Sequence, residues 1–187
     1  MVSTHGLSLA ALFAALTALG ALLSFPIPLS PVPVTLQTLF IYLAGLILGS
    51  RFAVLSQVIY VALRLSGLSQ PTGAAPGVAA LFGPTGGFIV GFIFLGLVVG
   101  MLSGDRSRLT FRRAVIACTI GTAVLYLLGA VQLSNFFITN SHLDFQSAVV
   151  RAANTGLLLF IPGDILKVIA ASLIASRPQV RAAVGKL

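Results

Sequence analysis

The sequence predicts an all-α integral membrane protein, a single bundle of six transmembrane helices with both termini in the cytoplasm. Of the 187 residues, 58% are hydrophobic and 7% are charged, and the mean hydropathy is +1.10. One soluble core could not bury so many apolar side chains. The apolar segments are long, rich in Leu, Ala and Gly, and lack strict alternation, which favours helices over a barrel.

Six apolar segments are candidate spans, because a hydrocarbon core about 30 Å thick requires roughly 17–25 helical residues. They lie near residues 7–25, 34–50, 52–68, 85–102, 114–133 and 160–176. The first lacks the basic n-region of a signal peptide and is longer than a typical signal core, so we expect a retained helix. The segment 134–156 either lies on the surface as an amphipathic segment or continues into the membrane.

The basic residues indicate the topology. The net charge is +8, and eight of the eleven basic residues fall in alternate connections between spans, as positive-inside topology requires. These eight are Arg51, Arg106, Arg108, Arg112, Arg113, Arg177, Arg181 and Lys186. We therefore expect the charges to orient the chain in the lipid membrane, with no nucleic-acid partner.

Catalysis is not expected. Cys118 is the single cysteine, which excludes an intrachain disulfide and a thiolate metal site. With three acids and two histidines, a metal centre is not expected, and the chain has no Walker A motif and no arrangement of nucleophile and base. The sequence predicts neither an enzyme nor a resident cofactor or metal.

Asp164 and Lys167 are the strongest candidate functional residues. They lie three residues apart within the apolar sixth segment, and ionisable residues at membrane depth usually face a cavity and a partner. Pro162 and Gly163 should break the helix just before Asp164 and leave its carboxylate near a helix N-terminus, where negative charge is favoured. The pair either binds a ligand or forms a structural ion pair that holds the last helix.

The link between the first two spans should be stiff and extended. It carries four prolines between residues 26 and 33, which fix φ and prevent a helix. Thr35 and Gln37 then enter the second span at its outer end. Their hydroxyl and amide groups could hydrogen-bond a ligand or a neighbouring carbonyl, and both possibilities stay open.

The next outer connection, residues 69–84, is expected to be a lid. Loops of this length in compact proteins are usually functional, and its glycines permit close approach of the backbone. Thr85 and Gly86 follow at the start of the fourth span. The alternative for Gly86 and Gly87 is close packing between helices, which is compatible with a lid.

Three motifs together resemble the BioY family, the biotin-binding substrate-capture (S) components of energy-coupling factor transporters. They are residues 31–38 (PVPVTLQT), 83–87 (GPTGG) and 162–167 (PGDILK), in this order along almost the whole chain. The resemblance implies one transmembrane substrate-binding domain, residues 1–187, in a bacterial plasma membrane. It would bind biotin from outside and deliver it inward with a transmembrane coupling (T) subunit and two ABC ATPase subunits.

The chemistry of biotin fits the candidate residues. On one helix face Asp164 could accept a hydrogen bond from a ureido N–H group while Lys167 donates to the ureido carbonyl. Arg64 stands where the family often has glycine, and it could receive the biotin carboxylate or extend to the lipid headgroups. Ser69-Gln70-Pro71 departs from the family pattern and removes an aromatic side chain from the lid. The predicted ligand-binding residues are Asp164, Lys167, Gln37, Thr35, Thr85, Gly86 and Arg64.

A stripe of small residues runs along the first span. Ala10, Ala14 and Ala18 recur every four residues, with Ala11 and Ala15 beside them, and such stripes let helices approach closely in lipid. The resemblance implies that Ala10, Ala14 and Ala18 dock on the coupling subunit. The alternative is packing inside the bundle.

Other functions are compatible with the same residues. The chain could be an S component for another vitamin, because a fold alone does not fix the ligand. It could also be an autonomous ion-coupled carrier in which Asp164 and Lys167 titrate. A membrane-embedded enzyme is disfavoured, since no nucleophile and base are placed together.

Overall fold

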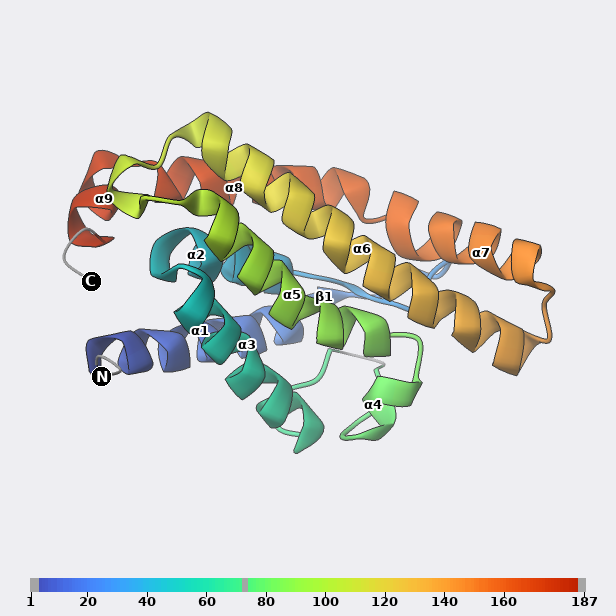
Figure 1. Ribbon diagram of the computed structural model, residues 1–187. Helices are drawn as coiled ribbons and strands as arrows, with labels where there is room; N and C mark the ends of the chain where they lie inside the picture. Colours follow the sequence, from blue (N-terminus) through green and yellow to red (C-terminus); the bar gives the residue numbers. More distant parts are fainter. Residues whose placement is uncertain (1–3, 72–73, 185–187) are drawn as a thin grey trace.

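The structure is a computed structural model that describes residues 4–71 and 74–184, and its helices pack side by side in an elongated bundle (Figure 1). The helices are α1 Thr4–Leu22, α2 Gln37–Leu48, α3 Ser50–Leu65, α4 Ala79–Phe82, α5 Gly86–Ser103, α6 Phe111–Ser141, α7 Phe145–Ala153, α8 Ile161–Ala175 and α9 Pro178–Val184. A short 3₁₀ helix, Arg106–Arg108, connects α5 to α6. The helical architecture expected from the composition is confirmed.

Helices α2 and α3 are joined by a sharp turn at Gly49. Its φ of +78° is a backbone conformation that residues with a side chain rarely adopt. Helix α2 has 12 residues and α3 has 16, so α2 extends only about 18 Å at 1.5 Å per residue. The second predicted span is therefore shorter than a full crossing of the hydrocarbon core.

Helices α5 and α6 form a closely packed pair. A Cβ atom at Gly87 of α5 would overlap the carbonyl oxygen of Leu128 in α6, so the two backbones touch there. Helix α6 has 31 residues, and the Thr110 side chain caps its N-terminus by accepting from the Arg113 backbone N–H. It extends past the predicted end at residue 133, so the start of the segment 134–156 continues this span.

The C-terminal part of the bundle is a broken helix. Helix α7 leads into a π-helical turn, Asn154–Leu158, and α8 continues after a bend of 41°. The Asp144 carboxylate caps α7 by accepting from the backbone N–H of Ser147. The break falls before Pro162 and Asp164, as the sequence predicts.

A small sheet interrupts the helical architecture, which the all-α prediction missed. Strand β1, Ser24–Phe25, pairs antiparallel with β2, Val34–Thr35, so that Ser24 lies opposite Thr35. The prolines between the two strands keep the link out of the helical conformation. The sheet fixes the position of Thr35 just before α2.

The count of six spans stays a prediction, because fewer than six of the described helices are long and apolar enough to cross a membrane at full length. Among the described residues, α1, α5 and α6 are long and apolar enough to span, and the bent pair α7 and α8 would make a fourth span. Helix α2 is apolar but shorter. Helices α2 and α3 have 12 and 16 residues, and hydropathy alone does not register where each helix ends.

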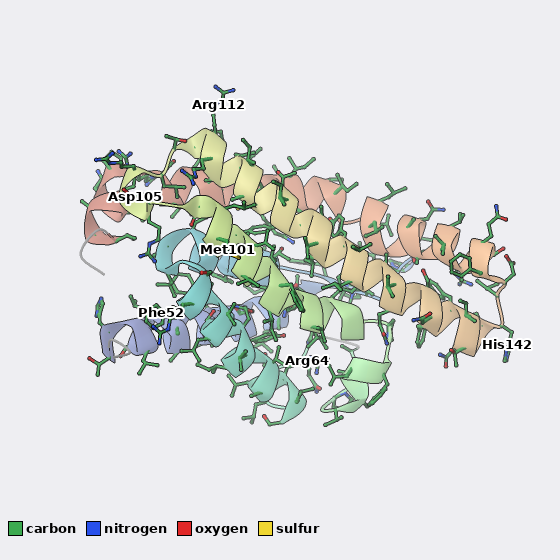
Figure 2. The ribbon with its side chains drawn as sticks, in the orientation of Figure 1. Phe52, Arg64, Met101, Asp105, Arg112 and His142 are labelled. Atoms are coloured by element: carbon green, nitrogen blue, oxygen red, sulfur yellow. The ribbon has the colours of Figure 1, made fainter. Side chains whose placement is uncertain are left out.

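The two described ends of the chain lie at the same end of the bundle, together with the connection between α5 and α6 (Figure 1). Arg106 of this connection donates a hydrogen bond to the carbonyl of Leu48 at the end of α2. Figure 2 shows Asp105 and Arg112 at this end and His142 at the opposite end. Lys186, the last of the eight basic residues, lies outside the described residues.

Candidate functional site

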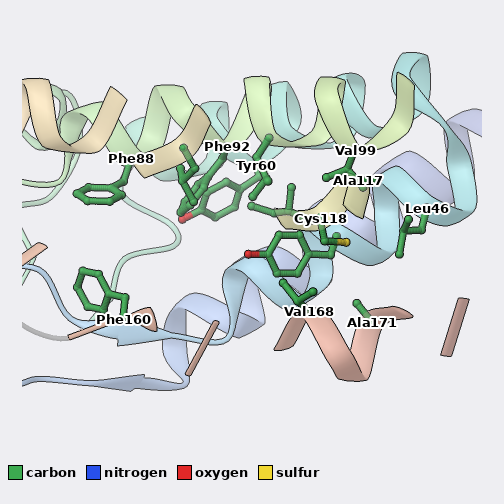
Figure 3. Packing of buried hydrophobic residues seen from close by; sticks show 14 of the residues in the cluster. Leu46, Tyr60, Phe88, Phe92, Val99, Ala117, Cys118, Phe160, Val168 and Ala171 are labelled. Carbon is green, nitrogen blue, oxygen red and sulfur yellow. The ribbon is translucent and has the colours of Figure 1, made fainter. Parts of the chain in front are cut away.

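A cavity lies inside the bundle and has a volume of about 610 Å³, counting the part open to the outside. Helices α2, α3, α5, α6 and α8 supply most of its wall, and the segment around β2 and the lid supply the rest. Its apolar wall includes aromatic rings that pack against one another, with Tyr60 and Phe92 6.1 Å apart and Phe88 and Phe160 6.3 Å apart between ring centroids (Figure 3). This is the combination of apolar wall and few polar groups typical of small-molecule sites.

Asp164 occupies the polar part of this cavity. It lies in the first turn of α8, is 6% exposed, and its two oxygens accept three hydrogen bonds. Thr38 Oγ1 donates to Oδ1 at 3.1 Å, and the Tyr126 hydroxyl donates to Oδ2 at 2.7 Å. The third donor is Lys167, whose Nζ atom lies 2.8 Å from Oδ1. The predicted ion pair between i and i+3 is present.

Lys167 is held by the same group of residues. Its Nζ atom also donates to Thr38 Oγ1 at 3.1 Å, so the threonine hydroxyl accepts from the ammonium and donates to the carboxylate. The charge pair is thus fixed to α2 through Thr38 and to α6 through Tyr126. Three elements far apart in sequence hold one carboxylate and one ammonium beside the cavity.

Thr38 and Tyr126 were missed as site residues from the sequence. A signal existed, because hydroxyl groups within apolar spans usually face the bundle interior rather than lipid. That signal is weak on its own, since a hydroxyl can also bond to its own helix backbone. Only the folded chain shows that Thr38 and Tyr126 meet Asp164.

Gln37 and Thr35 form a second polar group in the cavity wall. Thr35 Oγ1 donates to Gln37 Oε1 at 2.9 Å, and Gln37 Nε2 donates to the Tyr60 hydroxyl at 2.5 Å. Gln37 is 3% exposed and begins α2, as expected for a residue entering the second span at its end. Both predicted residues line the cavity, and Tyr60 joins them.

Thr85 and Gly86 are placed differently with respect to the cavity. Thr85 lines the cavity, whereas Gly86 is not among the lining residues. A Cβ atom at Gly86 would overlap the carbonyl oxygen of Leu81, so this glycine lets α5 pack against α4. Close packing, the alternative for Gly86, is present, and its contact with a ligand stays a prediction.

Arg64 is buried in the cavity wall. It lies in the last turn of α3 with 1% of its surface exposed, and Figure 2 shows it between the end of α3 and the segment that carries α4. Its Nη2 atom donates to the carbonyl oxygen of Ala75 at 2.8 Å. The possibility that Arg64 extends to the headgroups is therefore wrong, because the guanidinium points into the protein.

The predicted lid borders the cavity at Pro71 and is tethered at two points. Pro71 of the lid lines the cavity, and Ala75 is bound by Arg64. From α6, Gln132 Nε2 donates to the carbonyl oxygens of Leu81 at 3.3 Å and Gly83 at 3.5 Å. The lid is thus held between α3 and α6.

The alanine stripe does not form a free surface. Ala10 and Ala14 are fully buried inside the chain, and Ala18 is half-buried against the core. Helix α1 turns Ala10 and Ala14 towards the bundle, and docking through these residues stays a prediction. The alternative, packing within the bundle, is the one observed, and the neighbours Ala11 and Ala15 are exposed instead.

Comparison with known proteins identifies the family. The profile of the BioY family matches residues 1–186. The chain belongs to the BioY family. It is 38% identical over 172 residues to “Probable biotin transporter BioY” of Pyrococcus horikoshii, covering 92% of this chain and 94% of that protein.

A second relative and a solved structure agree with this family. The “Biotin transporter BioY” of Thermotoga maritima is 34% identical over 168 residues, 90% of this chain and 92% of the relative. The crystal structure of the S-component for biotin from an ECF-type ABC transporter superposes with a TM-score of 0.79 at 25% identity, covering 96% of this chain and 95% of that one. The BioY family consists of multi-pass membrane transporter components, not enzymes.

Proposed function

We propose that the chain is a biotin-capturing S component, and that the cavity between α2, α3, α5, α6 and α8 is where biotin binds. The observation that carries this proposal is the buried Asp164 and Lys167 pair, held by Thr38 and Tyr126 beside an aromatic cavity, in a chain of the BioY family.

The polar group matches the ureido end of biotin. The carboxylate can accept from a ureido N–H, and Lys167, whose ammonium has a third N–H beside the two that bond Thr38 and Asp164, can donate to the ureido carbonyl. The thioether ring would pack between Phe88, Phe92 and Phe160, which line the same cavity. Charge-assisted hydrogen bonds in a site that excludes water are stronger than neutral ones, which favours this head group.

Delivery of the ligand forms the second part of the proposal. A transmembrane coupling subunit and two ABC ATPase subunits would move bound biotin inward, with the lid end of the bundle facing outside a bacterial plasma membrane. The matched structure is described as an S-component from an ECF-type ABC transporter, which supports partners of this class. The basic residues at the end that holds the termini support the orientation.

The first test is the ligand itself. Purified protein in detergent is titrated with biotin and with two unrelated vitamins, thiamine and riboflavin, by isothermal titration calorimetry. We expect one biotin per chain and no heat of binding from the other two. A chain that binds another vitamin and not biotin would contradict the assignment of the ligand, and the family fold would be unaffected.

A second test separates capture from autonomous carriage. Proteoliposomes that contain this chain alone should bind labelled biotin without concentrating it when a proton or sodium gradient is imposed. Gradient-driven accumulation would contradict the requirement for a coupling subunit and favour the ion-coupled carrier. Vesicles without protein are the control for leakage.

A further inference from the structure

Resting on the proposed function, we infer that Arg64 is the subsite for the tail carboxylate of the ligand, and that it joins this carboxylate to the lid. The inference concerns a residue that lines the cavity from α3, whereas Asp164 and Lys167 line it from α8. It is argued from the burial of Arg64, its hydrogen bonds, the number of acids in the chain and the layout of the cavity wall.

The first observation is an unused donor group in the cavity wall. Arg64 is 1% exposed and lines the cavity, and its Nη2 atom is engaged by the carbonyl oxygen of Ala75. Its Nη1 atom is buried and has no hydrogen-bond partner among the described residues. A buried donor without a partner is costly, and a charged one more so.

The second observation is that the chain has no spare acidic side chain for Arg64. It contains three acids, and Asp164 is already paired with Lys167. Asp105 and Asp144 are exposed and cap other helices, and hydrogen bonds from Ser107 and Ser147 lower the pKa of these two carboxyl groups. A guanidinium remains charged in proteins, and no acidic side chain of this protein neutralises Arg64, so the site is suited to an anionic ligand.

The charges in the cavity wall also indicate that an anionic partner for Arg64 is missing. Its ionisable side chains with a formal charge at neutral pH are Arg64, Lys167 and Asp164. Two positive charges and one negative charge leave a net charge of +1, which a ligand with a single carboxylate would neutralise. The surplus lies at Arg64, because Lys167 and Asp164 neutralise each other at 2.8 Å.

The layout of the cavity separates the two charged sites. Thr38 of α2 hydrogen-bonds Asp164. The residue before it, Gln37, hydrogen-bonds Tyr60 of α3. Arg64 lies one helical turn beyond Tyr60, a rise of about 6 Å. Aromatic and aliphatic side chains line the space between these groups. The cavity therefore fits a ligand with a hydrogen-bonding head, an apolar middle and an anionic tail.

Because Arg64 also binds Ala75 of the lid, a ligand carboxylate bound to Arg64 would affect the lid as well. The guanidinium presents two separate NH₂ groups, so it can hold the lid carbonyl through Nη2 and a ligand oxygen through Nη1 at the same time. A bound carboxylate would hold the guanidinium in the orientation that also binds the lid. A ligand with a neutral tail would not hold the Arg64 guanidinium in this orientation.

The test compares biotin with its primary amide, which has the same length and no charge at the tail. Calorimetric titrations use the wild type, Arg64→Met, Arg64→Lys and the matched control Arg51→Met. Arg51 is an exposed arginine at the other end of α3, outside the cavity. We expect the wild type to bind biotin about ten- to a hundredfold more tightly than the amide.

The variants should show where this preference arises. Arg64→Met should lose the preference by weakening biotin binding while leaving binding of the amide within about twofold, and Arg51→Met should retain it. Arg64→Lys keeps the charge without the planar fork, so it should retain part of the preference. Amide binding by each variant also reports that it is folded.

Several outcomes would overturn the inference. Equal affinity of the wild type for biotin and the amide would do so, whether or not any variant folds. So would an Arg64→Met protein that loses both ligands equally while its thermal melting is unchanged, or a preference that disappears in Lys167→Met and persists in Arg64→Met. A wild type that binds neither ligand would instead contradict the proposed function on which the inference rests.

Discussion

At the scale of single residues, the Thr38 hydroxyl links Asp164 and Lys167. Its hydroxyl donates to Asp164 and accepts from Lys167, so one oxygen atom contacts both members of the ion pair. The Tyr126 hydroxyl satisfies the second carboxylate oxygen. Because every polar atom of Asp164 is engaged, a ligand here meets a rigid acceptor whose position is set by α2, α6 and α8.

The prediction at this scale concerns Asp164 and Lys167. Asp164→Asn keeps the shape and removes the charge, and Lys167→Met removes the ammonium with little change in length. Each should weaken biotin binding by about 1.5–3 kcal/mol, which corresponds to about ten- to more than a hundredfold. The measurement is calorimetry on protein that elutes as a single folded species.

The control for this prediction is a pair of ligands. An analogue altered only at the ureido group should bind the wild type poorly and lose little more on Asp164→Asn, because that contact is already absent. The amide of the tail should keep full sensitivity to the same substitution. If both variants bound biotin as well as the wild type, the ion pair would be structural.

At the scale of elements, close backbone contacts of α5 with its neighbouring helices fix the cavity wall. A Cβ atom at Gly100 of α5 would overlap the backbone at Gly49 and Ser50, where α2 turns into α3. Gly87 makes the corresponding approach to α6. Helix α5 is therefore packed on both sides through glycines, and the aromatic residues it carries reach the cavity from a fixed backbone.

Gly100→Ala tests this packing. The added methyl group meets backbone, which cannot move away as a flexible side chain can, so we expect a loss of about 1–3 kcal/mol and a lower melting temperature. Gly163→Ala is the matched control, because nothing lies within 4 Å of a Cβ atom there and its φ is not positive. Equal melting temperatures for the two variants would contradict the packing argument.

Helix α1 has an inner and an outer face that a tryptophan scan can separate. Ala14 is 0% exposed, so Ala14→Trp should disrupt the bundle and lower both thermal stability and biotin binding. Ala15 is exposed, so Ala15→Trp should leave both unchanged. The readouts are melting temperature and calorimetry.

Copurification with the coupling subunit is the second readout of this scan. If the exposed face of α1 docks on that subunit, Ala15→Trp should abolish copurification without affecting the ligand. A stable Ala14→Trp protein that binds biotin normally and loses only the complex would support docking through Ala10, Ala14 and Ala18.

The whole molecule has two chemically different ends. The end that holds the termini carries the basic connection between α5 and α6, whereas α4 of the lid lies away from that end (Figure 1). Arg113 Nε donates to the carbonyl oxygen of Leu102 at 3.0 Å and fixes that connection. This difference between the two ends fits the proposed function, in which the ligand enters from the lid side. The partner subunits would then bind within the membrane or at the end that holds the termini.

Labelling of single cysteines tests the orientation. In a Cys118→Ala background, Val78→Cys in the lid and Ser107→Cys in the basic connection place thiols at exposed positions. On intact cells an impermeant maleimide should label position 78 and not position 107, and permeabilised cells should label both. Labelling of 107 and not 78 in intact cells would reverse the orientation and put the cavity mouth in the cytoplasm.

The sequence by itself determined the membrane environment, the helical class and the close pairing of Asp164 with Lys167. These features depend on composition and on residues a few positions apart, whose relation a helix fixes locally. It could not show that Thr38 and Tyr126 bind Asp164, that Arg64 is buried, or that Ala14 turns inward. A helical pattern gives the faces of a helix but not which neighbour each face meets, and that is decided only when helices distant in the chain pack together.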